Sequence, residues 1–115
     1  MRRKDRVALQ ARASIFAALG DATRLTVLAK LSKGAPHSIS RLTEGTKLSR
    51  QAVTKHLRVL EAAGVVHCVR AGRESLFEFK PEPIDDIKSY LDAVSMQWDE
   101  TLARLKSLVE DVILN

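Results

Sequence analysis

Apolar residues recur at helical spacing along most of the chain, and this spacing predicts a mostly helical fold. Residues 6–19 are rich in alanine, with Leu9, Ala13 and Phe16 three or four positions apart. Residues at this spacing share one helix face. Gly20 is the expected end of this first helix.

A second helix is predicted over residues 22–33. Asp21 precedes it and is a favourable N-cap, because its carboxylate can accept a hydrogen bond from the free amide groups of the first turn. Gly34 is the expected stop. The apolar stripe of this helix is predicted to consist of Leu25, Leu28 and Leu31.

Two further helices, joined by a tight turn, follow the break at Pro36. Ser38 is expected to cap the short helix SISRLTEGT, which turns Ile39 and Leu42 inward. After residues 46–48, Ser49 is expected to cap a longer helix that ends before Gly64. A short helix, a turn and a second helix form the helix-turn-helix pattern.

The periodicity changes from helix to strand after Gly64. Residues 65–71 (VVHCVRA) and 75–80 (SLFEFK) read as two strands joined by a turn at Gly72-Arg73-Glu74. In the second strand Phe77 and Phe79 alternate with other residues, which predicts one buried aromatic face. The two strands therefore predict a β-ribbon, or wing, with Arg73 at its tip.

A long helix over residues 83–114 is predicted to close the chain, with Pro83 in its first turn. Its apolar residues follow a heptad pattern, and about 30 helical residues span roughly 45 Å, more than so small a domain covers alone. We therefore expect a homodimer, although the helix could also pack on its own domain. The residues predicted to make the dimer are Ile84, Ile87, Leu91, Val94, Trp98 and Leu105.

The stretch 49–66 (SRQAVTKHLRVLEAAGVV) divides into an apolar and a polar helix face. Val53, Leu57 and Leu60 fall on one side at about 100° per residue. Gln51, Thr54, Lys55 and Arg58 fall on the other, with no acidic residue before Glu61. His56 falls beside the apolar face, which suggests a structural role.

A polar face without acids suits the major groove of DNA. Gln, Arg and Lys donate hydrogen bonds to base edges, Thr contacts bases or phosphates, and an acid would repel the phosphate backbone. The alternative is an ordinary solvated basic surface. The order of elements favours DNA, and the residues predicted to contact it are Ser38, Ser49, Arg50, Gln51, Thr54, Lys55, Arg58 and Arg73.

The distribution of charge supports a polyanionic partner for one part of the chain. Residues 1–80 carry 16 Lys and Arg against 6 Asp and Glu, a net charge of +10. Residues 81–115 carry 3 against 8, a net charge of −5. A basic body and an acidic C-terminal segment together indicate nucleic-acid binding by the first part only.

Composition and motifs argue against a membrane protein and against an enzyme. The 115 residues, 45% hydrophobic and 29% charged, predict a single domain over residues 1–115. No apolar run is long enough to span a membrane, and the single cysteine, Cys68, is consistent with a reducing, cytoplasmic location. No phosphate-binding loop or nucleophile motif occurs, so no enzymatic activity and no cofactor are predicted.

Three blocks of the sequence together resemble the ArsR/SmtB-type repressors: LGDATRLTVLAKL, LSRQAVTKHLRVLEAAGVV and RAGRESLFEF. The resemblance covers about residues 13–80. It implies a mostly α winged helix-turn-helix fold with a small β-wing. It also implies a homodimeric repressor that pairs through its first and last helices, with Gln51, Thr54, Lys55 and Arg58 on the reading helix and Arg73 on the wing.

The chain departs from the metal sensors of that family. Where some carry a Cys-x-Cys pair, this chain has Ser38 and Ser40, and no histidine follows His67. Soft metals need thiolate or imidazole ligands, so no metal response is predicted. Two alternatives stay open: a protein-interaction module that uses the heptad helix, and a repressor released by an unidentified small organic ligand.

Overall fold

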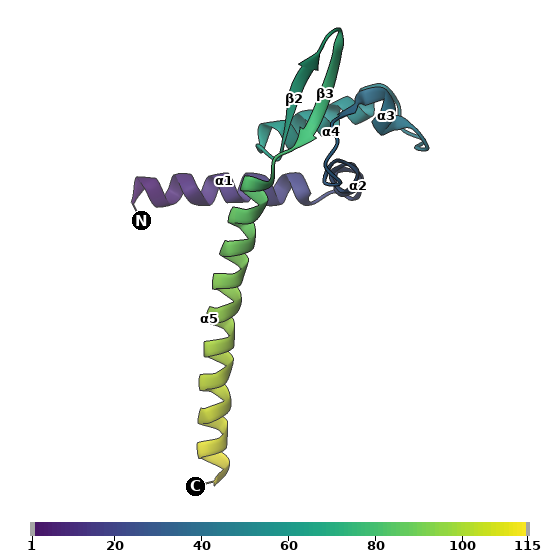
Figure 1. Ribbon diagram of the computed structural model, residues 1–115. Coiled ribbons are helices and arrows are strands. Elements are labelled where there is room, and N and C mark those ends of the chain that lie inside the picture. Colours follow the sequence, from purple (N-terminus) through teal and green to yellow (C-terminus); the bar gives the residue numbers. More distant parts are fainter. Residues whose placement is uncertain (1, 115) are drawn as a thin grey trace. The chain divides into compact units, whose positions relative to one another are not determined.

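Among the described residues, four of the five helices and a small antiparallel sheet lie in the first part of the chain (Figure 1). The computed structural model describes residues 2–114. The chain divides into two units, Met1–Ile84 and Asp85–Asn115, which are described separately. The elements are α1 (Arg3–Leu19), α2 (Ala22–Leu31), β1 (His37–Ser38), α3 (Ile39–Thr43), α4 (Arg50–Ala62), β2 (Val66–Ala71), β3 (Glu74–Phe79) and α5 (Pro81–Leu114).

Side-chain caps fix the start of three helices, as the sequence predicts. The Asp21 carboxylate accepts a hydrogen bond from the Arg24 amide at 3.0 Å. The hydroxyl of Ser38 accepts from the Arg41 amide at 3.2 Å, and that of Ser49 from the Ala52 amide at 3.1 Å. Each cap satisfies an amide that has no partner within its own helix.

The core of the first unit forms around the apolar face of α4. Val53, Leu57 and Leu60 are each 0% exposed, which confirms the face predicted for this helix. Helices α1, α2 and α3 and strand β2 all contact α4. The other large, fully buried side chains are Leu31, Leu42, Val65 and Val66.

The apolar stripes of the first two helices are buried only in part. In α1 the buried side chains are Ile15 and Ala18, whereas Leu9 is 39% exposed and Phe16 is also exposed. Only the C-terminal part of α1 is buried, so its remaining apolar residues stay at the surface of the single chain. Ala13 is exposed as well.

In α2 the burial is rotated relative to the prediction. Leu28 and Leu31 are buried as expected, but Val27 is buried in place of Leu25, which is 51% exposed. At about 100° per residue, Leu31 lies between Val27 and Leu28 on one face, while Leu25 lies about 60° beyond Leu28 and about 160° from Val27.

The wing is part of a three-stranded antiparallel sheet in the order β1-β3-β2. Strand β1, which the sequence did not predict, pairs His37 with Phe77 and Ser38 with Leu76. Strands β2 and β3 pair from Val66 opposite Phe79 to Ala71 opposite Glu74, which leaves a turn of two residues, Gly72 and Arg73. Gly72 has φ +65°, a left-handed conformation that glycine adopts without strain.

The last helix begins earlier than predicted, at Pro81 rather than Pro83. Both prolines fit the first turn, because its amide groups have no carbonyl partner and proline fixes a helical φ. Of the predicted dimer residues, Trp98 is 62% exposed, Leu91 and Leu105 are exposed, and Ile84 and Val94 are half-exposed. Ile87 is already buried in the single chain.

Replacement of Leu57 by alanine should destabilise the protein by about 3 kcal/mol, because it removes a fully buried side chain and leaves a cavity at the centre of the core. Leu25→Ala removes the same atoms from an exposed position and should cost about 0.5 kcal/mol or less. Urea denaturation followed by circular dichroism measures both. Equal losses for the two variants would contradict the assigned core.

Candidate nucleic-acid interface

The outer face of α4 is an exposed polar surface with a hollow at its N-terminal end. Gln51, Lys55 and Arg58 are exposed, and Thr54 is half-buried. The hollow, about 650 Å³ in volume, is lined by Ser49, Arg50, Gln51, Ala52, Thr54 and Lys55. The structure therefore brings five of the eight predicted DNA-contacting residues together around one concave surface.

The hydroxyl of Thr54 is occupied within its own helix. It donates a hydrogen bond to the Arg50 carbonyl oxygen at 2.7 Å. A threonine bonded in this way still presents its methyl group, which can contact the methyl group of a thymine. Thr54 is thus better placed for an apolar contact than for hydrogen bonding.

Arg58 lies further along α4 and forms an ion pair at the edge of the polar face. Its Nη1 donates to Glu61 Oε1 at 3.2 Å, and both side chains are partly exposed. An exposed pair three residues apart contributes well under about 1 kcal/mol. Arg58 can therefore exchange Glu61 for a base or phosphate at little cost.

A second hollow, about 270 Å³ in volume, joins α3, α4 and the wing. It brings together Ser38, Arg50 and Arg73, which the sequence predicted separately. It also contains Ser40 and Ser75, which the sequence did not predict, because serines two positions from a cap or in a wing strand have no distinctive pattern. Its lining is Ser38, Ile39, Ser40, Arg50, Arg73, Glu74 and Ser75.

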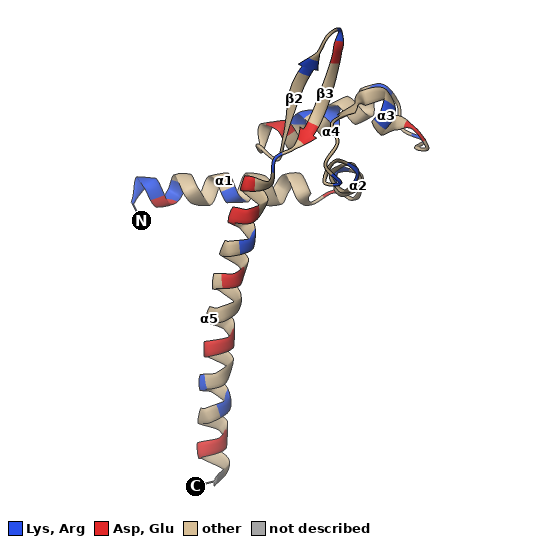
Figure 2. Ribbon diagram, in the orientation of Figure 1, with Lys and Arg blue, Asp and Glu red and all other residues tan. Residues whose placement is uncertain are grey.

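The hydroxyl groups and two guanidinium groups of this hollow suit a phosphate oxygen and outnumber its one carboxylate, that of Glu74. Arg provides fixed donors and a charge that does not titrate, and a serine hydroxyl donates one further hydrogen bond. Figure 2 shows basic residues on α3, on α4 and at the far end of the β2–β3 hairpin. Figure 2 also shows that the charged residues of α5 are mostly acidic, consistent with the net charges of the two segments.

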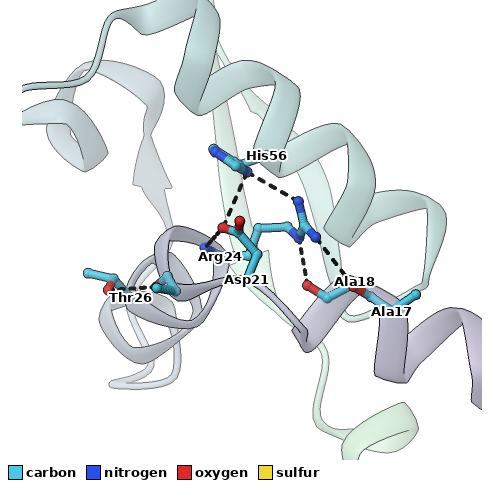
Figure 3. A network of polar contacts seen from close by, with 7 residues as sticks. Ala17, Ala18, Asp21, Arg24, Thr26 and His56 are labelled. Atoms are coloured by element: carbon cyan, nitrogen blue, oxygen red, sulfur yellow. Dashed lines mark hydrogen bonds and ion pairs between the residues drawn. The ribbon is translucent and has the colours of Figure 1, made fainter.

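His56 is not part of the polar face. Its imidazole is half-buried on the inner side of α4, with Nδ1 3.8 Å from Asp21 Oδ2 and 3.4 Å from Arg24 Nη1 (Figure 3). The structural role predicted for this histidine fits that position. The hydrogen bond from the Arg24 amide, together with the nearby guanidinium and imidazole, holds the pKa of Asp21 below its ordinary value of 3.8.

The remaining histidines and the cysteine lie in and around the sheet. His37 Nδ1 is 2.7 Å from the Ala35 carbonyl oxygen, and His67 Nε2 is 2.7 Å from Glu78 Oε1 on the neighbouring strand. Cys68 is exposed on β2. Within residues 2–114, no group of three or more histidine, cysteine or acidic side chains is arranged to hold a metal ion. Over the same residues, no helix is both long and apolar enough to cross a lipid bilayer.

Comparisons with known proteins consistently find helix-turn-helix transcriptional regulators. Residues 11–69 match a family model described as a helix-turn-helix domain. The uncharacterized HTH-type transcriptional regulator YuzN of Bacillus subtilis (strain 168) is 38% identical over 80 residues, which cover 64% of this chain and 87% of YuzN.

Similar solved structures also include transcriptional regulators of the ArsR type. An ArsR-like transcriptional regulator from Rhodococcus sp. RHA1 is 36% identical, with a TM-score of 0.79 over 88% of this chain and 94% of that one. A homodimeric winged helix-turn-helix DNA-binding domain from Mycobacterium bovis, a possible ArsR-family regulator, is 22% identical, with a TM-score of 0.66 over 89% and 91% of the two chains. The second likeness is one of fold alone.

Asp21→Asn should make the stability of the protein less dependent on pH. Because the folded pKa of Asp21 lies below 3.8, the ionised carboxylate contributes its full stabilisation above that pH and loses it as the pH falls through the folded value. Asparagine keeps the capping oxygen without the charge, so the wild type should be the more stable protein at pH 6, and the difference should shrink towards pH 3.

Thermal unfolding between pH 3 and 7 measures this difference. Asp99→Asn, on an exposed turn of α5, controls for the loss of one negative charge elsewhere in the chain. A constant difference between wild type and Asp21→Asn across the whole range would show that the charge on Asp21 stabilises nothing.

Proposed function

Because the chain belongs to the ArsR-type family of winged helix-turn-helix transcriptional regulators, we propose that it is a homodimeric repressor that binds an inverted-repeat operator. The observation that carries the proposal is the two-sided character of α4. Val53, Leu57 and Leu60 fix the helix in the core, and this places Gln51 and Lys55 on the opposite, exposed side. The outer face of a helix held in this way can enter a major groove while the buried face keeps its contacts in the core.

The exposed residues divide into two kinds of contact. Gln51 and Arg58 have the donors that read base edges, adenine for Gln and guanine for Arg. Lys55, Arg50 and the serines of the second hollow suit phosphates, which fix the position of the helix without reading sequence. Arg73, at the tip of the wing, suits a phosphate or a neighbouring minor groove.

The proposed dimer rests on apolar side chains that remain exposed on α5. Leu91, Trp98, Leu102, Leu105 and Val109 are exposed and recur at intervals of three, four or seven residues, which places them along one side of the helix. In a homodimer, two such stripes can pack against each other, so that each copy of the chain buries the apolar side chains of the other. Leu9 and Val7 on α1 are also exposed and fit the same role.

The two-fold symmetry of the proposed dimer determines the symmetry of the operator. Each protomer presents one α4 to the DNA, so the binding site contains two half-sites in inverted orientation. Their centres lie one helical turn apart, about 34 Å, or a multiple of that distance.

We also propose that soft metal ions do not release this repressor. The position of one family metal site holds Ser38, and its hydroxyl is used to cap α3 through the Arg41 amide. A serine hydroxyl is a poor ligand for zinc compared with a thiolate. A stoichiometric zinc complex that weakens operator binding would contradict this part of the proposal.

Lys55→Gln and Gln51→Ala should have different effects on DNA binding. Removing the Lys55 charge should weaken binding to all duplexes alike and lower the magnitude of the salt slope, d log K/d log[salt], by about 0.9. Removing the Gln51 amide should leave that slope unchanged and relax discrimination at one base pair by about 1–3 kcal/mol. Fluorescence anisotropy at several salt concentrations, on an operator selected from random duplexes, measures both. Identical behaviour of the two variants would argue against the division into phosphate and base contacts.

Leu105→Asp should convert the protein from dimer to monomer, because it places a charge in the proposed apolar contact. Ser107→Asp adds the same charge to the opposite side of α5 and should leave the dimer intact. Sedimentation equilibrium gives the mass of each variant. A wild-type monomer, or a Leu105→Asp variant that remains dimeric, would refute the proposed role of this stripe.

A further inference from the structure

One arginine connects three helices of the first unit. Arg24, in the first turn of α2, donates through Nε to the Ala18 carbonyl oxygen at 2.6 Å and through Nη2 to the Ala17 carbonyl oxygen at 3.3 Å. Its Nη1 lies 3.4 Å from His56 Nδ1 on α4. Figure 3 shows the guanidinium between the end of α1 and the imidazole.

The α1 side of this connection is strong for a general reason. The last carbonyl groups of a helix have no amide partner within the helix, and the C-terminal end carries a partial negative charge. The guanidinium satisfies the Ala18 carbonyl and adds a second donor to the Ala17 carbonyl, which already accepts from the Gly20 amide at 3.2 Å, and its charge complements the helix end. The backbone of Arg24 is fixed as well, because its amide donates to the Asp21 cap.

The α4 side of the connection defines the state of His56. Arginine has donors and no acceptor, so the guanidinium donates to Nδ1 in the tautomer of the neutral imidazole that carries its proton on Nε2. Asp21 Oδ2 lies 3.8 Å from the same nitrogen and complements the guanidinium charge. His56 is therefore fixed by α2, and α2 by the end of α1.

We propose that Arg24 and His56 are positioning residues that set the orientation of the DNA-reading helix α4. The proposal rests on the proposed function, since it concerns the accuracy with which α4 presents its outer face. Val53, Leu57 and Leu60 hold the helix in the core, but apolar packing is non-directional. A directed polar contact from α2 adds a constraint on rotation about the helix axis.

The position of His56 suits this role. It follows Lys55 directly and lies about one and a half turns from Gln51, so a rotation that moves the imidazole moves the whole outer face. Base contacts depend on the alignment of individual donors and acceptors, whereas phosphate contacts tolerate small displacements. Loss of the contact should therefore reduce specific binding more than non-specific binding.

The test compares operator affinity with affinity for a random-sequence duplex. In His56→Leu and in Arg24→Gln, the ratio of these affinities should fall about tenfold, while binding to the random duplex changes little. In His56→Asn the side-chain oxygen stands near the position of Nδ1 and can accept from Arg24, so the ratio should stay near that of the wild type.

A double variant and a matched control make the test specific. Because both residues act through one contact, His56→Leu with Arg24→Gln should lose little more than either change alone. Thr26→Ala, also on α2, removes a hydroxyl that donates to the Ala22 carbonyl of its own helix, and it should leave the ratio unchanged. All variants are compared at a temperature at which circular dichroism shows them fully folded.

Each outcome decides the inference. Unchanged ratios in folded His56→Leu would overturn it, as would a loss in His56→Asn equal to that in His56→Leu. If Arg24→Gln does not fold, the two His56 variants still decide. A wild-type protein that shows no preference for any duplex would instead refute the proposed function, and the two failures are therefore distinguishable.

Discussion

The buried face of α4 is the constraint on which the rest of the structure depends. Val53, Leu57 and Leu60 are inaccessible to solvent, and three other helices and a strand contact the helix around them. Burying this face fixes α4, and the helical repeat then determines which residues remain outside. The polar face therefore follows from the packing of the core, because any rotation of α4 that moves one face also moves the other.

The charges of the chain are arranged around this helix. The first 80 residues have a net charge of +10, and the hollow between α3, α4 and the wing contains Arg50 and Arg73. The C-terminal segment carries a net charge of −5 beside its exposed apolar residues. The two segments thus suit different partners, a polyanion for the first and another protein surface for the second. Members of this family are transcriptional regulators, which confirms the prediction that the chain is not an enzyme.

The sequence predicted those parts of the structure that depend on residues close together along the chain. The caps at Asp21, Ser38 and Ser49, the two faces of α4 and the wing follow from hydrogen-bonding capacity and periodicity. Tertiary contacts were harder to predict. Strand β1 is two residues long and is defined by its pairing with β3, and Leu25 is exposed although α2 contacts α1, α4 and β3.

The polar network was partly visible in the sequence. Periodicity moved His56 away from the outer face, but no pattern indicated that Arg24, 32 residues earlier, reaches both this imidazole and the end of α1. Ser40 and Ser75 were missed for the same reason, since their place in the second hollow comes from the meeting of α3 with the wing.

Selection of bound sequences from a pool of random DNA duplexes tests the central claim most directly, that two copies of α4 read DNA together. We expect enrichment of one inverted repeat, bound by two chains, whose half-site centres lie about 34 Å apart or a multiple of that distance. Recovery of unrelated sequences, or of a single asymmetric site bound by one chain, would contradict it.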